Sequence, residues 1–357
     1  MNPEYSHTEL SRRDFLKLSA YGLLGLMVSP IQFDTRTSED LKNVKINFEF
    51  VNHQSERDID GIRQEIDKND LLIIENVGWT KGELELFNDV SRGKISEEKI
   101  VEIVGDPYFR QLLLEIRKSK KPIRFIDISK ESSLESERFS VLNSKNLDFS
   151  KTLSEQGMDL YVNLKKYADW QRRREDEMIK NLAVTVASVK RDYRYNNKDL
   201  KVMMICGVSH TRLMHLLGKE NEVDFQYPSK PFVFSYEDEA IRRFWFSEDM
   251  VDPKKVKKPD TELIAHVILE KIMKNWFYYS NQDKFSNTAE LDKWMRNVVS
   301  KFSVGNIMEI WDKRRTGLKK SDPLASLPTK EMANTIAKMM TEKGVNSKYI
   351  VAGLKQI

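Results

Sequence analysis

The feature that most constrains the fold is a continuous apolar run, residues 202–206, which stops at a glycine and is soon followed by His210. A strand that is apolar at every position has to be buried on both faces, as the inner strands of helix-covered parallel sheets are. Similar strand-like runs occur at residues 44–51 and 71–74, and a further one lies within 122–129. The sequence therefore predicts that residues 202–206 form an inner strand of a sheet.

Segments with helical periodicity separate these runs, which is the pattern of α/β units around a mainly parallel sheet. We expect an α/β core at residues 44–240, whose last strand is at 230–237. Long helices are expected at about 130–198, inserted before the sheet resumes, and amphipathic helices fill residues 241–357. The predicted fold is thus a mainly parallel central sheet flanked by helices, with a helical insertion and a helical C-terminal extension.

Residues 1–32 resemble the leader that the twin-arginine export machinery reads. Residues 11–17 match the S-R-R-x-F-L-K pattern completely, and a short apolar stretch follows. That stretch is shorter than the about 20 residues that span a membrane. No A-x-A cleavage site follows and Pro30 lies where a peptidase would cut, so a retained leader that tethers the protein to the membrane is the alternative to cleavage. After a linker at 33–43, we expect an exported protein, in the periplasm or at the cell surface.

The charge of the chain is nearly balanced, with 59 Lys and Arg against 55 Asp and Glu and a net charge of +4. The small excess is spread along the sequence, which argues against dedicated nucleic-acid binding. The single cysteine, Cys206, lies inside the apolar run. We expect it to pack as a small hydrophobic residue rather than to act as a nucleophile, and no disulfide can form within one chain.

Four reactive side chains follow predicted strands: His53, Glu75, Asp127 and His210. Ligands of open α/β sheets bind beyond the carboxyl ends of the strands, where loops can vary without disturbing the core. A lone histidine or carboxylate at such a position is most often structural, but four at one sheet edge favour a shared site. We therefore expect these four side chains to lie together.

The chemistry of these residues is coherent. Two imidazoles and a carboxylate can hold a divalent metal with an open position for water, or the imidazoles can act as bases oriented by carboxylates. Glu75 follows four apolar residues, so its buried carboxylate needs a partner charge, a metal or a proton. Arg174, in a charged helical segment, can reach the site as an anion clamp, and Asp127 is a candidate for cofactor binding.

These residues look like those of the superfamily that contains the TraB pheromone-shutdown proteins, the Tiki metalloproteases, the erythromycin esterases and the ChaN-like haem-binding lipoproteins. That family carries two G-x-x-H motifs, a strand-end glutamate and an Arg-Asn/Asp-x-x-Met helix start. Residues 207–210, Gly-Val-Ser-His, match the second motif, and Glu75 is similar to the glutamate. Residues 174–178, Arg-Glu-Asp-Glu-Met, approximate the arginine motif, and residues 50–53 keep the first histidine without the glycine.

The resemblance implies an exported hydrolase of peptide or ester bonds that acts on a peptide or a small molecule. In a Tiki-like protein His53, Glu75 and His210 would bind a divalent metal such as Mn²⁺, whereas in an esterase-like protein they would activate water without a metal, with a histidine as the base. In either case Arg174 would stabilise the developing negative charge. A ChaN-like protein would instead bind haem or another cofactor without catalysis. The last alternative is an export-associated scaffold whose strand-end polar residues are merely hydrogen-bonded.

Overall fold

The computed structural model describes residues 41, 44–51, 59–143, 146–191, 199–218, 221–227, 232–249, 259–285, 288–315 and 329–354. The predicted leader, most of the predicted linker and His53 lie outside these residues. The chain divides into two compact units, each taken by itself below. Unit 1 comprises residues up to Glu135 and Arg174–Pro228, and unit 2 comprises Ser136–Arg173 and Ser229–Ile357.

Unit 1 is built on a five-stranded sheet with the order β3-β2-β4-β1-β5, in which every pair of neighbours is parallel. The apolar run predicted as an inner strand lies in its central strand, between two neighbours, which confirms that prediction. The strands are β1 (Val44–Val51), β2 (Leu71–Ile74), β3 (Ile123–Arg124), β4 (Leu200–Gly207) and β5 (Glu222–Gln226).

Both faces of the sheet are buried, and this explains the uninterrupted apolar runs. Side chains alternate between the faces along each strand. In β2, Leu71 and Ile73 pack in one apolar cluster with the second half of a long helix, whereas Leu72 and Ile74 pack in another with four shorter helices. Cys206 is buried in the first of these clusters, as predicted for a core residue.

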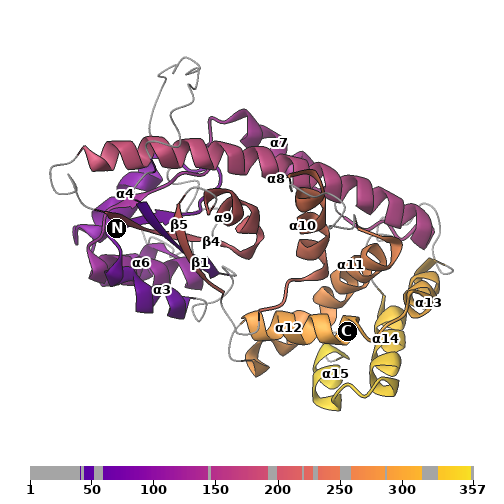
Figure 1. The fold of residues 1–357 in the computed structure, drawn as a ribbon. Helices are drawn as coiled ribbons and strands as arrows, with labels where there is room; N and C mark the ends of the chain where they lie inside the picture. The colour runs from indigo at the N-terminus through magenta and orange to yellow at the C-terminus, as the bar shows by residue number, and fades with distance from the viewer. Residues whose placement is uncertain are drawn as a thin grey trace, which may run out of the picture. The chain divides into compact units, whose positions relative to one another are not determined.

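Three helices of unit 1 begin at a residue whose side chain accepts a backbone N–H of the first turn, in keeping with their local sequences. Thr80 and Glu83 form a capping box at one helix, and Asp106 precedes Pro107 at another. The helices and 3-10 turns are α3 (Asp60–Glu65), η3 (Ile66–Lys68), α4 (Lys81–Ser91), α5 (Glu97–Ile103), α6 (Pro107–Ser119), η5 (Val208–His210) and α9 (Thr211–Leu217). In Figure 1, α3, α4 and α6 lie together beside the strands.

A single helix, α8 (Leu153–Lys190), is 38 residues long and contributes its first part to unit 2 and its second part to unit 1. Thr152 and Glu155 exchange the two hydrogen bonds of a capping box at its start. The helix has no proline and is rich in Leu, Ala, Lys, Glu and Arg, which favour helix. Figure 1 shows it as one unbroken ribbon. The prediction of long helices between the third and fourth strands is confirmed.

Unit 2 is helical throughout its described residues and has its own apolar core, formed by the buried faces of its helices. The Thr329 side chain accepts a hydrogen bond from the Met332 N–H as an N-cap, and Gly344, just after the same helix, has a φ of +72°. Its elements are α7 (Ser133–Asn143, most of it in this unit), α10 (Tyr236–Asp249), α11 (Thr261–Met273), η7 (Lys274–Tyr278), η8 (Tyr279–Lys284), α12 (Thr288–Val299), α13 (Val304–Arg315), α14 (Lys330–Glu342) and α15 (Ser347–Leu354).

The α/β class and the helical C-terminal region are confirmed, but the predicted strand at 230–237 is wrong. Residues 232–235 are not a strand, and α10 begins at Tyr236. The aromatic residues that suggested a strand pack locally instead: the Phe232 and Phe234 rings meet edge to face, and Arg242 of α10 stacks on Phe234. The last strand is β5, which escaped notice because its largely exposed sequence, EVDFQ, carries little apolar signal.

In the described part of the chain, no helix is long and apolar enough to cross a membrane.

Candidate functional site

The candidate site lies at the carboxyl ends of β2 and β4, which are neighbours in the sheet of unit 1. Glu75 directly follows β2, and its N–H donates to the carbonyl oxygen of Ile205 at 2.9 Å, so its backbone is still paired with β4. Gly207 ends β4, and the 3-10 turn η5 then carries His210 to the start of α9. Parallel pairing therefore brings the glutamate and the histidine to the same edge.

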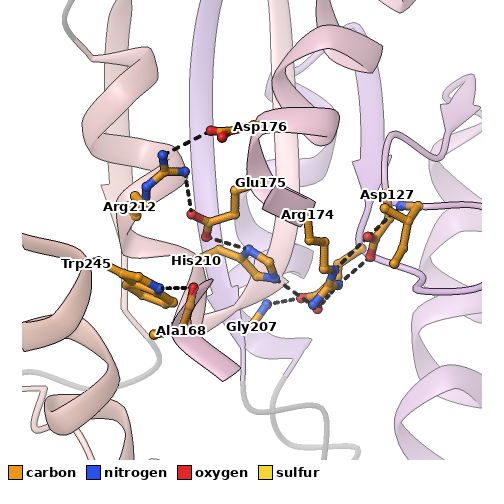
Figure 2. A network of polar contacts seen from close by, with 11 residues as sticks. Asp127, Ala168, Arg174, Glu175, Asp176, Gly207, His210, Arg212 and Trp245 are labelled. Carbon is orange, nitrogen blue, oxygen red and sulfur yellow. Dashed lines mark hydrogen bonds and ion pairs between the residues drawn. The ribbon is translucent and has the colours of Figure 1, made fainter. Parts of the chain in front are cut away.

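His210 is held between two carboxylates. Its Nδ1 lies 2.9 Å from Oε1 of Glu175, and its Nε2 lies 3.1 Å from Oε1 of Glu75. His210 and Glu175 are both fully buried, whereas the side chain of Glu75 is 16% exposed. Figure 2 shows the imidazole of His210 facing the carboxylate of Glu175. Solvent therefore reaches this pair of carboxylates through Glu75.

Glu75 accepts hydrogen bonds at both of its oxygens. Oε1 faces Nη2 of Arg174 at 2.7 Å as well as His210, and Oε2 accepts from the Gly207 N–H at 2.6 Å. The glycine amide thus ties the carboxylate to the end of β4, and the two cationic side chains fix it from the other side. These contacts define the orientation of Glu75 without any partner from outside the unit.

Arg174 is buried and forms a bidentate pair with Asp127. Its Nε donates to Oδ1 of Asp127 at 2.8 Å, and its Nη2 donates to Oδ2. Oδ1 also accepts the Ile128 N–H at 2.7 Å. This fork-to-fork geometry is the strongest arrangement of an arginine and a carboxylate. Asp127, predicted as a cofactor-binding residue, here holds the arginine that in turn contacts Glu75.

Glu175 has a further charged neighbour, Arg212. Arg212 lies 3.4 Å from Oε2 of Glu175 and 3.0 Å from Oδ1 of Asp176, which is largely exposed. The carboxylates of Glu75, Asp127 and Glu175 are thus matched by the cations of Arg174 and Arg212 and by a protonated His210. Leaving out Asp176, whose side chain is half exposed, these charges balance when His210 carries its proton.

The electrostatics of the site follow from this balance. Burial alone would lower the pKa of His210, but the charge of Glu75 and the hydrogen bonds to Glu175 and Glu75 outweigh it and raise the pKa to about 9. Burial likewise opposes the charge of Arg174, yet Asp127 and Glu75 raise its pKa further above the usual arginine range. His210 is therefore an imidazolium ion at neutral pH. Burial also raises the pKa of the Cys206 thiol, which keeps it a neutral core residue.

Of the residues predicted from the sequence, Glu75, Asp127, Arg174 and His210 are joined in one network of direct contacts. His53 lies outside the described residues. Val51, two positions before it, pairs in register with Gly207 across β1 and β4.

Two buried partners were missed, Glu175 and Arg212. Glu175 stood in the sequence as the Glu of an approximate Arg-Asn/Asp-x-x-Met motif, so its motif position was the signal that could have identified it. Arg212 follows His210 by two residues and carries no comparable signal. In contrast, the neighbouring Arg173 is exposed and pairs with Glu137.

Whether a metal ion fits can be judged from Glu75 and His210, the two predicted ligands that the structure describes. Oε1 of Glu75 and Nε2 of His210 are 3.1 Å apart, a spacing that two ligands of one ion could also have. However, that oxygen already faces Arg174, and both ring nitrogens of His210 face carboxylates. Among the described residues there is no group of three His, Cys, Asp or Glu side chains placed to bind a metal. As arranged here, the described residues do not fit a metal.

Comparison of the chain with protein-family models, with curated proteins and with solved structures finds no match. The resemblance to the TraB, Tiki, erythromycin esterase and ChaN-like superfamily therefore rests on the motif residues alone. The hydrolase and haem-binding functions that it implies stay predictions.

We predict that Arg174→Met destabilises unit 1 strongly, while Arg173→Met, one residue earlier on α8, does not. Losing Arg174 leaves the buried carboxylate of Asp127 without its counter-charge, which costs about 3–5 kcal/mol. Arg173 forms an exposed pair with Glu137, worth at most about 1 kcal/mol. Urea unfolding of the full chain, with hydrogen exchange to localise the effect, measures both. Equal effects of the two variants would contradict a buried role for Arg174.

We also predict that the free energy of unfolding falls as the pH rises from about 6.5 to about 9. His210 has a raised pKa in the folded protein and an ordinary one, about 6.5, in the unfolded chain. Its stabilising contribution is complete below pH 6.5 and is lost as the pH rises through 9, by up to about 3 kcal/mol. Urea unfolding at successive pH values tests this, with His210→Gln as the control that flattens this part of the curve. A wild-type curve as flat as that of the variant would refute the prediction.

Proposed function

We propose that the protein is a metal-independent hydrolase of carboxylic esters, in which Glu75 activates water. The observation that supports this most directly is the clamp on His210, whose two nitrogens contact Glu75 and Glu175 in a fully buried setting. Such paired, buried ionisable groups at the carboxyl edge of a parallel sheet are typical of active sites. The strand-end placement and the motif resemblance point in the same direction.

In the proposed reaction Glu75 is the catalytic residue, because it is the partly exposed carboxylate of the buried cluster. Glu75 accepts a proton from a water molecule as the water oxygen attacks the carbonyl carbon of the ester. It then returns that proton to the leaving oxygen as the carbon–oxygen bond breaks, which gives an acid and an alcohol. A positioned carboxylate base of this kind typically contributes about 10²–10⁴ in rate.

His210, Arg174, Asp127 and Glu175 are positioning residues in this proposal. His210 and Arg174 hold the carboxylate of Glu75 ionised and in one orientation, because both donate to its Oε1. Since His210 is protonated at neutral pH, it supports Glu75 as a cation and does not itself serve as the base. Esters are favoured over peptides because an alkoxide departs with less help from an acid than an amine anion does.

We predict that Glu75→Gln lowers kcat by about 10²–10⁴ on p-nitrophenyl acetate and butyrate, since the amide cannot accept the proton. The matched control is Glu115→Gln, a buried carboxylate of α6 in unit 1 whose ionic partners, Arg63 and Lys118, are outside the network. Chelator treatment leaves the wild-type rate unchanged if no metal takes part. Full ester hydrolysis by Glu75→Gln, or its loss with chelator and recovery with Mn²⁺, would overturn the proposal.

The role of Glu175 has a distinct readout in the same assay. Glu175→Gln removes one of the two carboxylates that hold the proton on His210, so the alkaline limb of the pH–rate profile moves to lower pH. A purely structural role would lower the rate without moving that limb.

We further propose that the protein reaches the far side of the cytoplasmic membrane in folded form through the twin-arginine machinery, on the strength of the motif at residues 11–17. Replacing Arg12 and Arg13 by lysine together is predicted to leave the protein inside the cell. Fractionation of cells expressing the two forms measures this, and the size of the exported form shows whether the leader is kept. Export of the double variant at the wild-type level would refute the route.

A further inference from the structure

Unit 2 contains a cavity of about 540 Å³ that is separate from the network described above. It lies among the first turns of α8, the start of α11 and α13, and its walls include Leu153, Tyr161, Ile264, Ile268 and Val304. Cavities of about 300–1,000 Å³ with mostly apolar walls are where proteins bind small organic molecules. By size and by wall chemistry, this cavity is of that kind.

The charge around the cavity limits what it can hold. Of the described residues that line it, Asp260 carries the only charge, and its Oδ1 already accepts the Leu263 N–H at 2.8 Å as the N-cap of α11. An anionic group in the cavity would therefore lose its hydration and meet no cation among these residues, and a cationic group would have to share a carboxylate that already caps α11. An uncharged ligand avoids this cost.

The mouth of the cavity carries two methionines with unusually high exposure. Met158 of α8 is 65% exposed and Met308 of α13 is 52% exposed, and both line the cavity. Methionine is flexible and polarisable, so it adapts to apolar ligands of different shapes. Exposed apolar side chains beside a cavity are typical of ligand sites rather than of inert surface.

A glycine forms part of the cavity wall where a helix would favour a larger residue. Gly157 lies in the second turn of α8, where glycine is unfavourable compared with alanine. A Cβ at this position would meet only Cγ2 of Ile264, at the ordinary contact distance of 3.7 Å. The backbone therefore does not require glycine here, and its effect is to leave space in the cavity.

We propose that this cavity binds a small, uncharged apolar molecule, such as a medium-chain alcohol, between α8, α11 and α13. The site is independent of the proposed hydrolysis, because all the residues that line it belong to unit 2.

The test is a titration of the full-length protein with octan-1-ol, followed by NMR of ¹³C-labelled methionine methyl groups. The methyl signals of Met158 and Met308 are expected to shift together and to saturate. Those of Met203 and Met204, buried in the sheet of unit 1, serve as internal controls and are expected to stay in place.

Two variants of one residue form a matched pair. Gly157→Leu fills the cavity, and overpacking of this size weakens binding about tenfold to a hundredfold. Gly157→Ala adds one methyl group without a clash, so it keeps octanol binding within a few-fold while raising the denaturation midpoint. Should Gly157→Leu fail to fold, Met158→Lys at the exposed mouth is tested in its place. This variant is expected to weaken octanol binding because it places a charge where the alkyl chain of octanol enters the cavity.

The proposal fails if octanol leaves Met158 and Met308 unshifted, or if Gly157→Leu binds as well as the wild type. It also fails if the two signals move with protein concentration alone, because the mouth would then be a contact between copies of the chain. Octyltrimethylammonium or octanoate binding much more tightly than octanol would likewise overturn the choice of an uncharged ligand.

Discussion

The buried pair of Arg174 and Asp127 is the interaction on which the rest of the site depends. Removing both charges from water is costly, and the bidentate geometry, with the Ile128 N–H as a further donor, offsets that cost. Because Arg174 also contacts Glu75, one guanidinium joins the segment after β3 to the end of β2. The carboxylate of Glu75 also contacts Gly207 and His210, which bind it to the end of β4. The edge of the sheet is therefore fixed by charge as well as by backbone pairing.

This arrangement sets the protonation state of the histidine. The charge of Glu75 and the hydrogen bonds to Glu175 and Glu75 outweigh the burial of the imidazole and raise the pKa of His210 to about 9, so that it is an imidazolium ion at neutral pH. A histidine in this state can orient and stabilise an anion but cannot accept a proton from water. In the hydrolysis that we propose, water is therefore activated by the carboxylate that solvent reaches, which is Glu75.

Much of this site could be predicted from the sequence, for a simple geometric reason. Parallel strands place their carboxyl ends at one edge, so Glu75, Asp127 and His210 had to converge once their strands were recognised. The burial of Arg174 was harder to predict, because it depends on which face of α8 packs against the sheet. Glu175 and Arg212 could not be distinguished from ordinary surface charges in the sequence. In the run QRRREDE, residues 171–177, Arg174 and Glu175 are buried whereas Arg173 and Asp176 are exposed, and only the packing of the helix decides which of them are buried. The strand β5 was missed because it lies at the edge of the sheet, pairs with one neighbour only and is largely exposed, so it does not need an apolar sequence.

The existing contacts of Glu75 and His210 also set the free-energy cost of binding a metal ion at this site. An ion bound by Glu75 and His210 would have to take the place of the His210 proton and compete with Arg174 for the same oxygen. With a pKa of about 9, removing that proton at pH 7 costs about 3 kcal/mol before any ligand bond forms. Metal affinity at this site would thus rise steeply with pH, whereas a water-activating Glu75 needs no such change. For this reason the reaction that we propose is the metal-independent one.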